Sequence, residues 1–539
     1  MAPVNISAAV ERSAVLGNRA AGHNGVIQSR RGVANTHPNI WVEVLTPRDQ
    51  RHEVPIVMVH GDYHTGSVWD MDLDRTQDSR TWAECFLGAG YQVHLVDLPG
   101  VRLSGSTTEG SDRPIEPRMA STGFVEVNLT GMGHRGPFMY DSAWRHVGFP
   151  GGQDGGPYSK PGWRQDPAFD YYYGQMEEKW EFSGRPVQWT MDAAAAVVSV
   201  IERLPSKRAV LVAEGRGSEV AMMVADYRPE LVASILAVGH SHAPFANTLA
   251  VCMAANKNRG VAFTGAAMTE RRAARQGIFD VPMQFYPPLP HQRDYNPEDG
   301  QVFETIVHRN EDGDECLLQD PAKTVRTLPF LAQVPIAIMT AEASINSSFD
   351  WAIVKFLEQA GVKTEWLKLA EFGILGNGPL PWLEKGAAES GKLAVAWATK
   401  TTSADANEVA AATALLTPSP ENVAVARERR REDRERADAK NGEEYFEWVH
   451  GWLDKTPADQ WHHPTTPADK YAFEVGLAWP IPPDMKYVDG VRYRRSGDHG
   501  TRGDGGNDGD DGNGGAGGRK RKRQDGDVGQ PGPSGGLAN

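Results

Sequence analysis

Side chains that can move protons stand directly after several apolar stretches of this chain. Histidine titrates near neutral pH, and carboxyl, phenol and hydroxyl groups can exchange protons with it when all of them converge on one substrate. Groups of these types at the ends of apolar stretches indicate general acid–base or nucleophilic chemistry. The candidates are Tyr63, His64, Glu214, His240, Ser241, His242 and Glu342.

Short apolar runs that alternate with helical patterns must position these side chains. Each run stops at Gly, Pro or a polar residue, which is typical of a parallel sheet buried on both faces. In such sheets the ligand binds beyond the carboxyl ends of the strands. The predicted strands are 55–59, 91–97, 209–213, 233–238 and 335–340, and the predicted helices are 80–89, 191–204, 219–227 and 350–360.

Segments that break this alternation set the expected domain organisation. Insertions at about 101–190 and 244–330 are long enough to form a lid over the site. An insertion at about 401–441 has dense charge of both signs, which predicts a solvated helix and not a nucleic-acid surface. We expect a poorly ordered arm over 1–38, an α/β domain over 39–455 with a final helix at 445–453, an extension over 456–495, and a disordered Gly-rich tail over 496–539.

Several segments of the chain resemble the α/β-hydrolase fold superfamily, and in particular a subgroup of fungal and bacterial hydrolase-like proteins. They are His60-Gly61 after the first strand, Asp97-Leu98-Pro99-Gly100 after the second, the strand–turn–helix at 211–218, and the segments 163–170, 340–344 and 372–378. The resemblance covers roughly residues 40–400 and the final helix at 445–453. It implies a doubly wound, mostly parallel α/β sheet with helical or irregular lid insertions.

The resemblance also locates a catalytic triad, two of whose positions hold residues that cannot do the chemistry. The fold places a nucleophile in the middle of a small-x-nucleophile-x-small turn, which packs tightly against neighbouring strands. That turn is Ala213-Glu214-Gly215-Arg216-Gly217, and Gly215 has no side-chain atom for covalent chemistry. Similar proteins have the sequence Gly-Asn-Gly-His after the last strand. In this chain Pro379 takes the place of that histidine, and proline cannot accept a proton. The acid position is retained as Glu342.

Two serines are alternative nucleophiles. Ser218 lies three positions beyond Gly215, in the following helix. Ser241 lies in Gly239-His240-Ser241-His242-Ala243, which matches the small-x-Ser-x-small pattern, but Pro244 follows it where an elbow helix should begin. The same stretch therefore also fits a loop that borders the pocket. His240 and His242 are then either polar groups of the pocket or structural histidines.

The loop at 60–66 is expected to keep the backbone geometry of an oxyanion hole. Backbone N–H groups there can stabilise an enolate or polarise a carbonyl without any nucleophile. The alternative is that Asp62 and His64 only hydrogen-bond the loop, and that Glu214 is a polar residue on a non-functional turn. The expected oxyanion residues are His60, Gly61 and Arg216, and the expected proton-transfer groups are Tyr63, His64, Glu214 and Glu342.

Composition limits the partners and the compartment. The 539-residue chain has a formal net charge of −14, which argues against a dedicated nucleic-acid binder. Its three cysteines cannot form a disulfide framework and residues 1–22 lack an apolar core, so we expect an intracellular, cytoplasmic protein. The basic run 519–523 is either a nuclear-localisation or anion-binding patch, or charge that solvates the tail. No metal or cofactor motif and no membrane-spanning stretch is expected.

Three functions fit these observations. The first is a non-hydrolytic enzyme that cyclises, condenses or isomerises a carbonyl-containing small molecule, for instance in secondary metabolism. The second is a catalytically inactive binding or regulatory protein with a small-molecule or protein partner. The third is an esterase-like hydrolase that uses Ser241 or Ser218 as a displaced nucleophile.

Overall fold

An eight-stranded sheet forms the centre of the protein, for which we have a computed structural model. The structure describes residues 27–28, 39–73, 80–101, 117–118, 125, 129–130, 145, 147, 149, 167–177, 179–180, 186–240, 243–245, 283–289, 303–312, 314–439, 485–488 and 491–494. The strands of the sheet are β1 (Ile27–Gln28), β2 (Asn39–Leu45), β3 (Ile56–Val59), β4 (Val93–Asp97), β7 (Ala209–Glu214), β8 (Val232–Val238), β11 (Ile336–Thr340) and β12 (Thr364–Lys368).

The strand order is β1-β2-β4-β3-β7-β8-β11-β12. Neighbours from β4 to β12 pair in parallel, and β2 runs antiparallel to β4. This confirms the predicted mostly parallel α/β sheet. The five predicted strands correspond to β3, β4, β7, β8 and β11.

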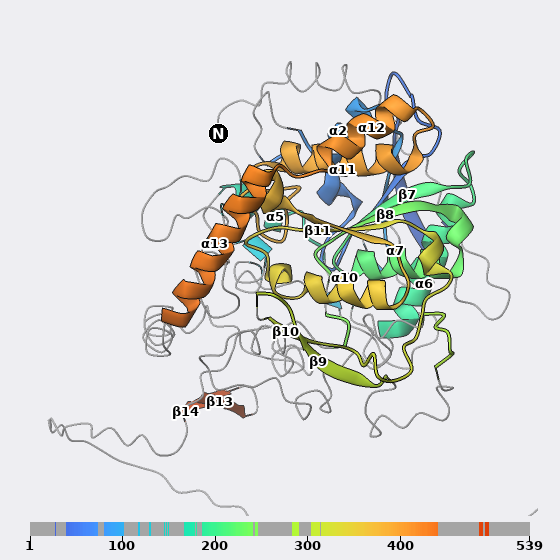
Figure 1. Cartoon of the computed structure of the whole chain (residues 1–539). Helices are drawn as coiled ribbons and strands as arrows, with labels where there is room; N and C mark the ends of the chain where they lie inside the picture. The colour runs from blue at the N-terminus through green and yellow to red at the C-terminus, as the bar shows by residue number, and fades with distance from the viewer. Residues whose placement is uncertain are drawn as a thin grey trace, which may run out of the picture.

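Successive residues of the inner strands belong to two separate apolar cores. In β3, Val57 and Val59 enter one core, whereas Ile56 and Met58 enter the other. The reason is that side chains alternate between the two faces of a strand. Helices α6 (Pro186–Ile201), α7 (Arg216–Tyr227) and α10 (Asp350–Gln359) cover one face, and α2 (Trp82–Gly88) and α11 (Ala387–Thr402) cover the other (Figure 1).

The four predicted helices overlap α2, α6, α7 and α10. Helix α2 begins with a capping box, in which Thr81 and Glu84 each bond the other's backbone N–H. Strand β12 was not predicted, because only Leu367 of its five residues is buried and the edge position leaves the others polar. The remaining helices are α5 (Pro167–Tyr173), α12 (Ala406–Leu415) and α13 (Pro420–Ala439), with 3-10 turns at Gly66–Asp70, Pro229–Leu231, Leu331–Gln333, Ile345–Ser348 and Leu369–Phe372.

Within the described residues, three further strand pairs lie outside the main sheet. Within the two predicted lid insertions, β5 (Pro117–Arg118) pairs with β6 (Lys179–Trp180), and β9 (Thr305–Arg309) pairs with β10 (Glu315–Gln319). Strands β13 (Met485–Val488) and β14 (Val491–Arg494) form a third antiparallel pair. In the part of the chain that the structure describes, no helix is both long and apolar enough to cross a bilayer.

The charged helix α13 is bound to the domain along one face, so the expectation of a solvated helix is wrong for that face. It lies at one end of the sheet (Figure 1). Asp433 is only 1% exposed and accepts a hydrogen bond from Arg145 Nε at 2.6 Å. Two arginines of α13 itself, Arg430 and Arg434, bind the buried carboxylate of Asp314. The predicted helix at 445–453 and the tail at 496–539 lie outside the described residues.

Candidate functional site

A sharp turn joins β7 to α7 at the predicted position. Gly215 stands between the strand and the helix with φ 51° and ψ −126°. That positive φ favours glycine, because side chains with a Cβ are strained there. At Gly217 a Cβ would come within 2.6 Å of the carbonyl oxygens of Val59 and His60, so the start of α7 packs directly against the end of β3. This close approach explains the small residue after the turn.

Space for a side chain exists at the apex of the turn. A Cβ on Gly215 would lie 3.6 Å from Gly61 Cα and 3.8 Å from the Gly239 carbonyl oxygen, which are ordinary contacts. A Cβ on Gly239 would in turn lie 3.8 Å from the carbonyl oxygen of Pro379. The segments that follow β7, β8 and β12 therefore approach one another here, at two glycines and a proline.

Glu214, beside the apex, occupies a backbone donor of the predicted oxyanion loop. Its side chain is buried, and its carboxylate accepts a hydrogen bond from the Gly61 N–H. The same carboxylate oxygen lies 2.7 Å from His64 Nδ1. The expectation that the Gly61 N–H polarises a substrate carbonyl is therefore wrong for this conformation, because the protein's own carboxylate binds it.

His64 extends this contact to a tyrosine. His64 Nε2 lies 2.6 Å from the hydroxyl of Tyr172, which is fully buried on α5. Burial, reinforced by the Glu214 carboxylate, raises the pKa of Tyr172 well above its usual value. The phenol therefore stays protonated and can donate to Nε2, in which case Nδ1 carries the hydrogen that faces Glu214. Tyr172 was not predicted as a site residue; the run Tyr171-Tyr172-Tyr173 was a visible signal, but it does not distinguish its middle member.

His60 has a structural role at the start of the same loop. Its Nδ1 donates to the Gly61 carbonyl at 2.7 Å, and its Nε2 accepts from the Leu98 N–H at 3.0 Å. Burial lowers the pKa of His60, so the ring is neutral and satisfied on both sides. His60 therefore holds the segments after β3 and β4 together.

The other two predicted residues of this region flank the loop. Tyr63 has a left-handed backbone (φ 66°), accepts a hydrogen bond from the Glu177 N–H through its carbonyl, and packs against an apolar core. Arg216 Nε lies 3.8 Å from the Asp62 carboxylate, and the guanidinium carbon lies 5.4 Å from the centre of a Trp189 ring. Both contacts shape the loop.

The structure places Ser218, an alternative nucleophile, inside the protein. Its side chain is fully buried, and its hydroxyl donates to the Ala213 carbonyl at 3.1 Å. No substrate can reach that oxygen without disrupting the start of α7. Ser241 and His242 lie outside the described residues, so a nucleophilic Ser241 stays a prediction.

For His240, the interpretation as a structural histidine fits better than that as a polar group of the pocket. It is buried, and its carbonyl accepts from Asn346 Nδ2 at 2.8 Å. Burial lowers the pKa of its imidazole to about 3. An imidazole with that pKa is neutral at physiological pH and is a weak base.

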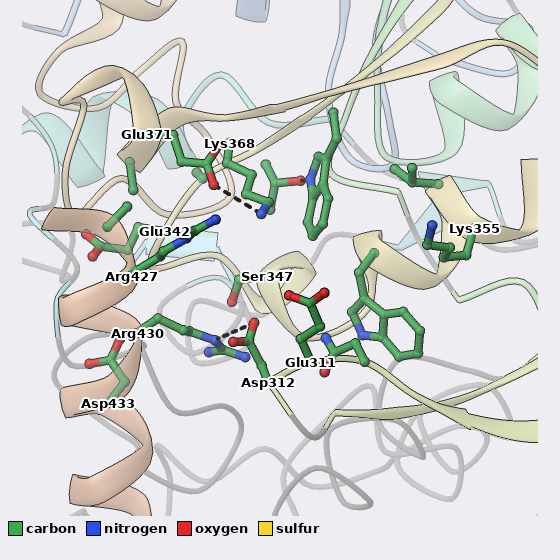
Figure 2. Close-up of a pocket in the computed structure, with 18 of the residues that line it drawn as sticks. Glu311, Asp312, Glu342, Ser347, Lys355, Lys368, Glu371, Arg427, Arg430 and Asp433 are labelled. Atoms are coloured by element: carbon green, nitrogen blue, oxygen red, sulfur yellow. Dashed lines mark hydrogen bonds and ion pairs between the residues drawn. The ribbon is translucent and has the colours of Figure 1, made fainter. Parts of the chain in front are cut away.

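Glu342, the predicted triad acid, is bound to arginines. Arg429 of α13 donates to both of its carboxylate oxygens, at 2.6 and 2.8 Å, and Arg145 Nε lies at 3.9 Å. The Gly376 N–H adds a further hydrogen bond at 2.7 Å. The side chain borders a cavity of about 650 Å³ beside β12 (Figure 2). Its charge is thus balanced by the arginines that dock α13, and the expected catalytic role is not supported.

Known proteins that are similar to this chain include lipases and esterases. No family model matches the chain. The chain is 25% identical over 371 residues to a fungal protein named probable secreted lipase phiG. The aligned residues make up 67% of this chain and 86% of the relative. Among solved structures, a novel bacterial esterase is 15% identical with a TM-score of 0.40 (70% of this chain, 92% of that one). The monoacylglycerol lipase of Paleococcus ferrophilus is 13% identical with a TM-score of 0.30 (66% and 97%).

The fungal relative contradicts the predicted intracellular location, whether cytoplasmic or nuclear, because its name gives it as secreted. The prediction relied in part on the three cysteines. A low cysteine count is compatible with secretion, because an α/β domain of this size buries a large core without disulfides.

The architecture provides the remaining evidence. A mostly parallel eight-stranded sheet carries helices on both faces, and its β7–α7 turn has a glycine at the apex. Together with the similarity to a fungal lipase, these features show that the chain has the α/β-hydrolase fold.

Proposed function

We propose that this protein binds a small molecule and does not hydrolyse esters through a covalent intermediate, which makes it an inactive relative of the α/β hydrolases. One observation carries the proposal: the apex of the turn is Gly215, and the neighbouring Glu214 carboxylate binds the Gly61 N–H. A covalent route needs a nucleophilic atom at the apex and free backbone donors for the oxyanion. Gly215 supplies no such atom, and one of the expected donors is already bound by the protein's own carboxylate. The similarity to a secreted lipase supports an extracellular location.

A non-hydrolytic enzyme is the second candidate, and the chain of contacts from Glu214 through His64 to Tyr172 favours it. A carboxylate, an imidazole and a phenol in series can transfer a proton. However, the hollow that the described residues form beside His64 and Tyr172 does not admit a water molecule. Acid–base catalysis would therefore require this region to open, and binding without turnover needs no such change.

The test compares the purified protein with three variants by fluorophosphonate labelling and p-nitrophenyl butyrate hydrolysis. We expect the wild-type protein to be unlabelled and to hydrolyse the ester no faster than Gly215→Ala. The double variant Gly215→Ser, Pro379→His restores a nucleophile at position 215, where space for a Cβ exists, and a base at position 379. We expect this double variant to become labelled. Wild-type turnover that disappears in Ser241→Ala would refute the proposal in favour of a displaced nucleophile.

The second candidate has its own test. Wild-type and Tyr172→Phe proteins are incubated with a panel of β-ketoesters and lactones, and products are followed by mass spectrometry. We expect no conversion by either protein. Conversion by the wild type that Tyr172→Phe abolishes, with the fold intact by circular dichroism, would replace the proposed function with the enzyme.

A further inference from the structure

We propose that the cavity beside β12 binds an aromatic monocarboxylate, with its ring against tryptophan and its carboxylate on Arg427. This inference deepens the proposed function and rests on it only for the binding role. The cavity of about 650 Å³ has the size of small-molecule sites. It is separate from the turn at Gly215, because β8 and β11 lie between β7 and β12 in the sheet. Figure 2 shows it between α10, the end of β9 and α13.

One wall is a fixed aromatic surface. Thr364, Trp366 and Lys368 line the cavity from β12, since alternate residues of a strand share one face. The Trp366 indole donates to Thr340 Oγ1 at 2.8 Å, and that hydroxyl donates to Asp350 at 2.6 Å. This chain of hydrogen bonds holds the ring in one orientation, so little side-chain entropy is lost when a planar ligand packs on it.

Helix α10 adds a second indole to the lining of the cavity. Trp351 of α10 lines the cavity and is 3% exposed. Its indole N–H donates to the Ser348 carbonyl at 3.0 Å, which anchors the ring at the start of α10. Two anchored indoles favour an aromatic ligand over an aliphatic one.

Most charges around the cavity are already balanced by neighbours. The Lys368 ammonium lies 3.1 Å from the Glu371 carboxylate and 4.1 Å from a Trp366 ring centre. The Lys355 ammonium lies 2.8 Å from the Glu358 carboxylate. The Arg430 guanidinium lies 2.8 Å from the carboxylate of Asp314 and 3.8 Å from that of Asp312. These pairs leave little net charge to attract a polyanion such as a polyphosphate.

Arg427 differs from these cations. It lines the cavity from α13 and has no hydrogen bond or ion pair with any residue that the structure describes. In Figure 2 its side chain extends from α13 toward the part of the cavity where Lys368 lies. A planar guanidinium binds a carboxylate through two parallel hydrogen bonds. One available guanidinium beside anchored indoles therefore matches a single carboxylate on an aromatic ring.

The experiment is calorimetric titration of the full chain with 2-naphthoate and with 2-naphthamide, its neutral counterpart. We expect naphthoate to bind at least tenfold more tightly, because an ionised acceptor strengthens the hydrogen bonds of Arg427. Arg427→Gln should remove that preference and leave naphthamide binding unchanged. Arg431→Gln, on the same helix and paired with Glu428, is the matched control and should change neither affinity. Trp366→Leu should weaken both ligands.

Three results would overturn the inference: no binding of naphthoate at millimolar concentration, equal affinities for the two ligands, or an unchanged naphthoate affinity in Arg427→Gln. Thermal melting of every variant establishes that it is folded. These outcomes are independent of the esterase assays, so loss of the cavity assignment and loss of the proposed function are distinguishable.

Discussion

At the scale of single residues, the buried Glu214 carboxylate holds the loop after β3 to the end of β7. Its partners are the Gly61 N–H and His64 Nδ1. We expect Glu214→Gln to lower the free energy of unfolding by about 1–3 kcal/mol, because a buried charged acceptor is lost. Urea denaturation measures the change. Glu358→Gln, which breaks the exposed pair with Lys355, is the control and should cost less than about 0.5 kcal/mol. Equal losses in both variants would contradict this role.

Asp350 predicts a specific pH dependence of stability. Burial raises the pKa of this carboxyl to about 7, against about 3.9 in an unfolded chain. The folded state therefore holds a proton that the unfolded state releases between these two values. The stability that this proton contributes is complete below about pH 4 and is lost as the pH rises through about 7, at up to about 1.4 kcal/mol per pH unit.

The measurement compares urea midpoints of the wild type and Asp350→Asn from pH 4 to pH 8. The difference in unfolding free energy should shift in favour of the variant as the pH rises, because asparagine stays neutral. Asp226, whose pKa burial raises to about 6, is present in both proteins and does not affect the difference. Parallel curves would show that Asp350 is ionised in the folded protein.

At the scale of elements, α13 is attached through buried carboxylates. Asp314 is 2% exposed and binds both Arg430 and Arg434. We expect Asp314→Asn to accelerate amide hydrogen exchange in α13 about tenfold or more, since two arginines lose a charge-assisted partner. Mass spectrometry of the peptide over 420–439 measures it. Glu428→Gln removes an exposed pair with Arg431 on the same helix and should leave exchange unchanged. Similar acceleration in both variants would mean that the buried pairs with Asp314 hold α13 in place no more than the exposed pair does.

At the scale of the whole molecule, the sheet separates two apolar cores that should respond independently. Val57 and Leu211 are neighbours on one face, and Val212 lies on the other. We expect a double-mutant cycle of Val57→Ala with Leu211→Ala to give a coupling energy of about 0.5–3 kcal/mol. The reason is that the two truncations would open one shared cavity in the same core. The cycle with Val212→Ala should be additive within about 0.5 kcal/mol. Comparable coupling energies in both cycles would indicate that the effect of a truncation on one face of the sheet reaches the other face.

The sequence by itself determined the sheet and the turn at its centre. Apolar runs of the right length predict the inner strands, since buried parallel strands must be apolar on both faces. The spacing of small residues around Gly215 likewise predicts the strand–turn–helix. These features depend on residues close together in the chain, which local patterns report.

Only the tertiary structure decided what surrounds the turn. The Glu214 contact with Gly61 spans 153 positions, and the contact of His64 with Tyr172 spans 108. Glu342 follows a strand as a triad acid would, yet it binds Arg429, 87 positions later in the chain. A local pattern shows which groups can bear charge, but long-range packing chooses the partner of each buried charge, and that choice separates a catalytic carboxylate from a docking one.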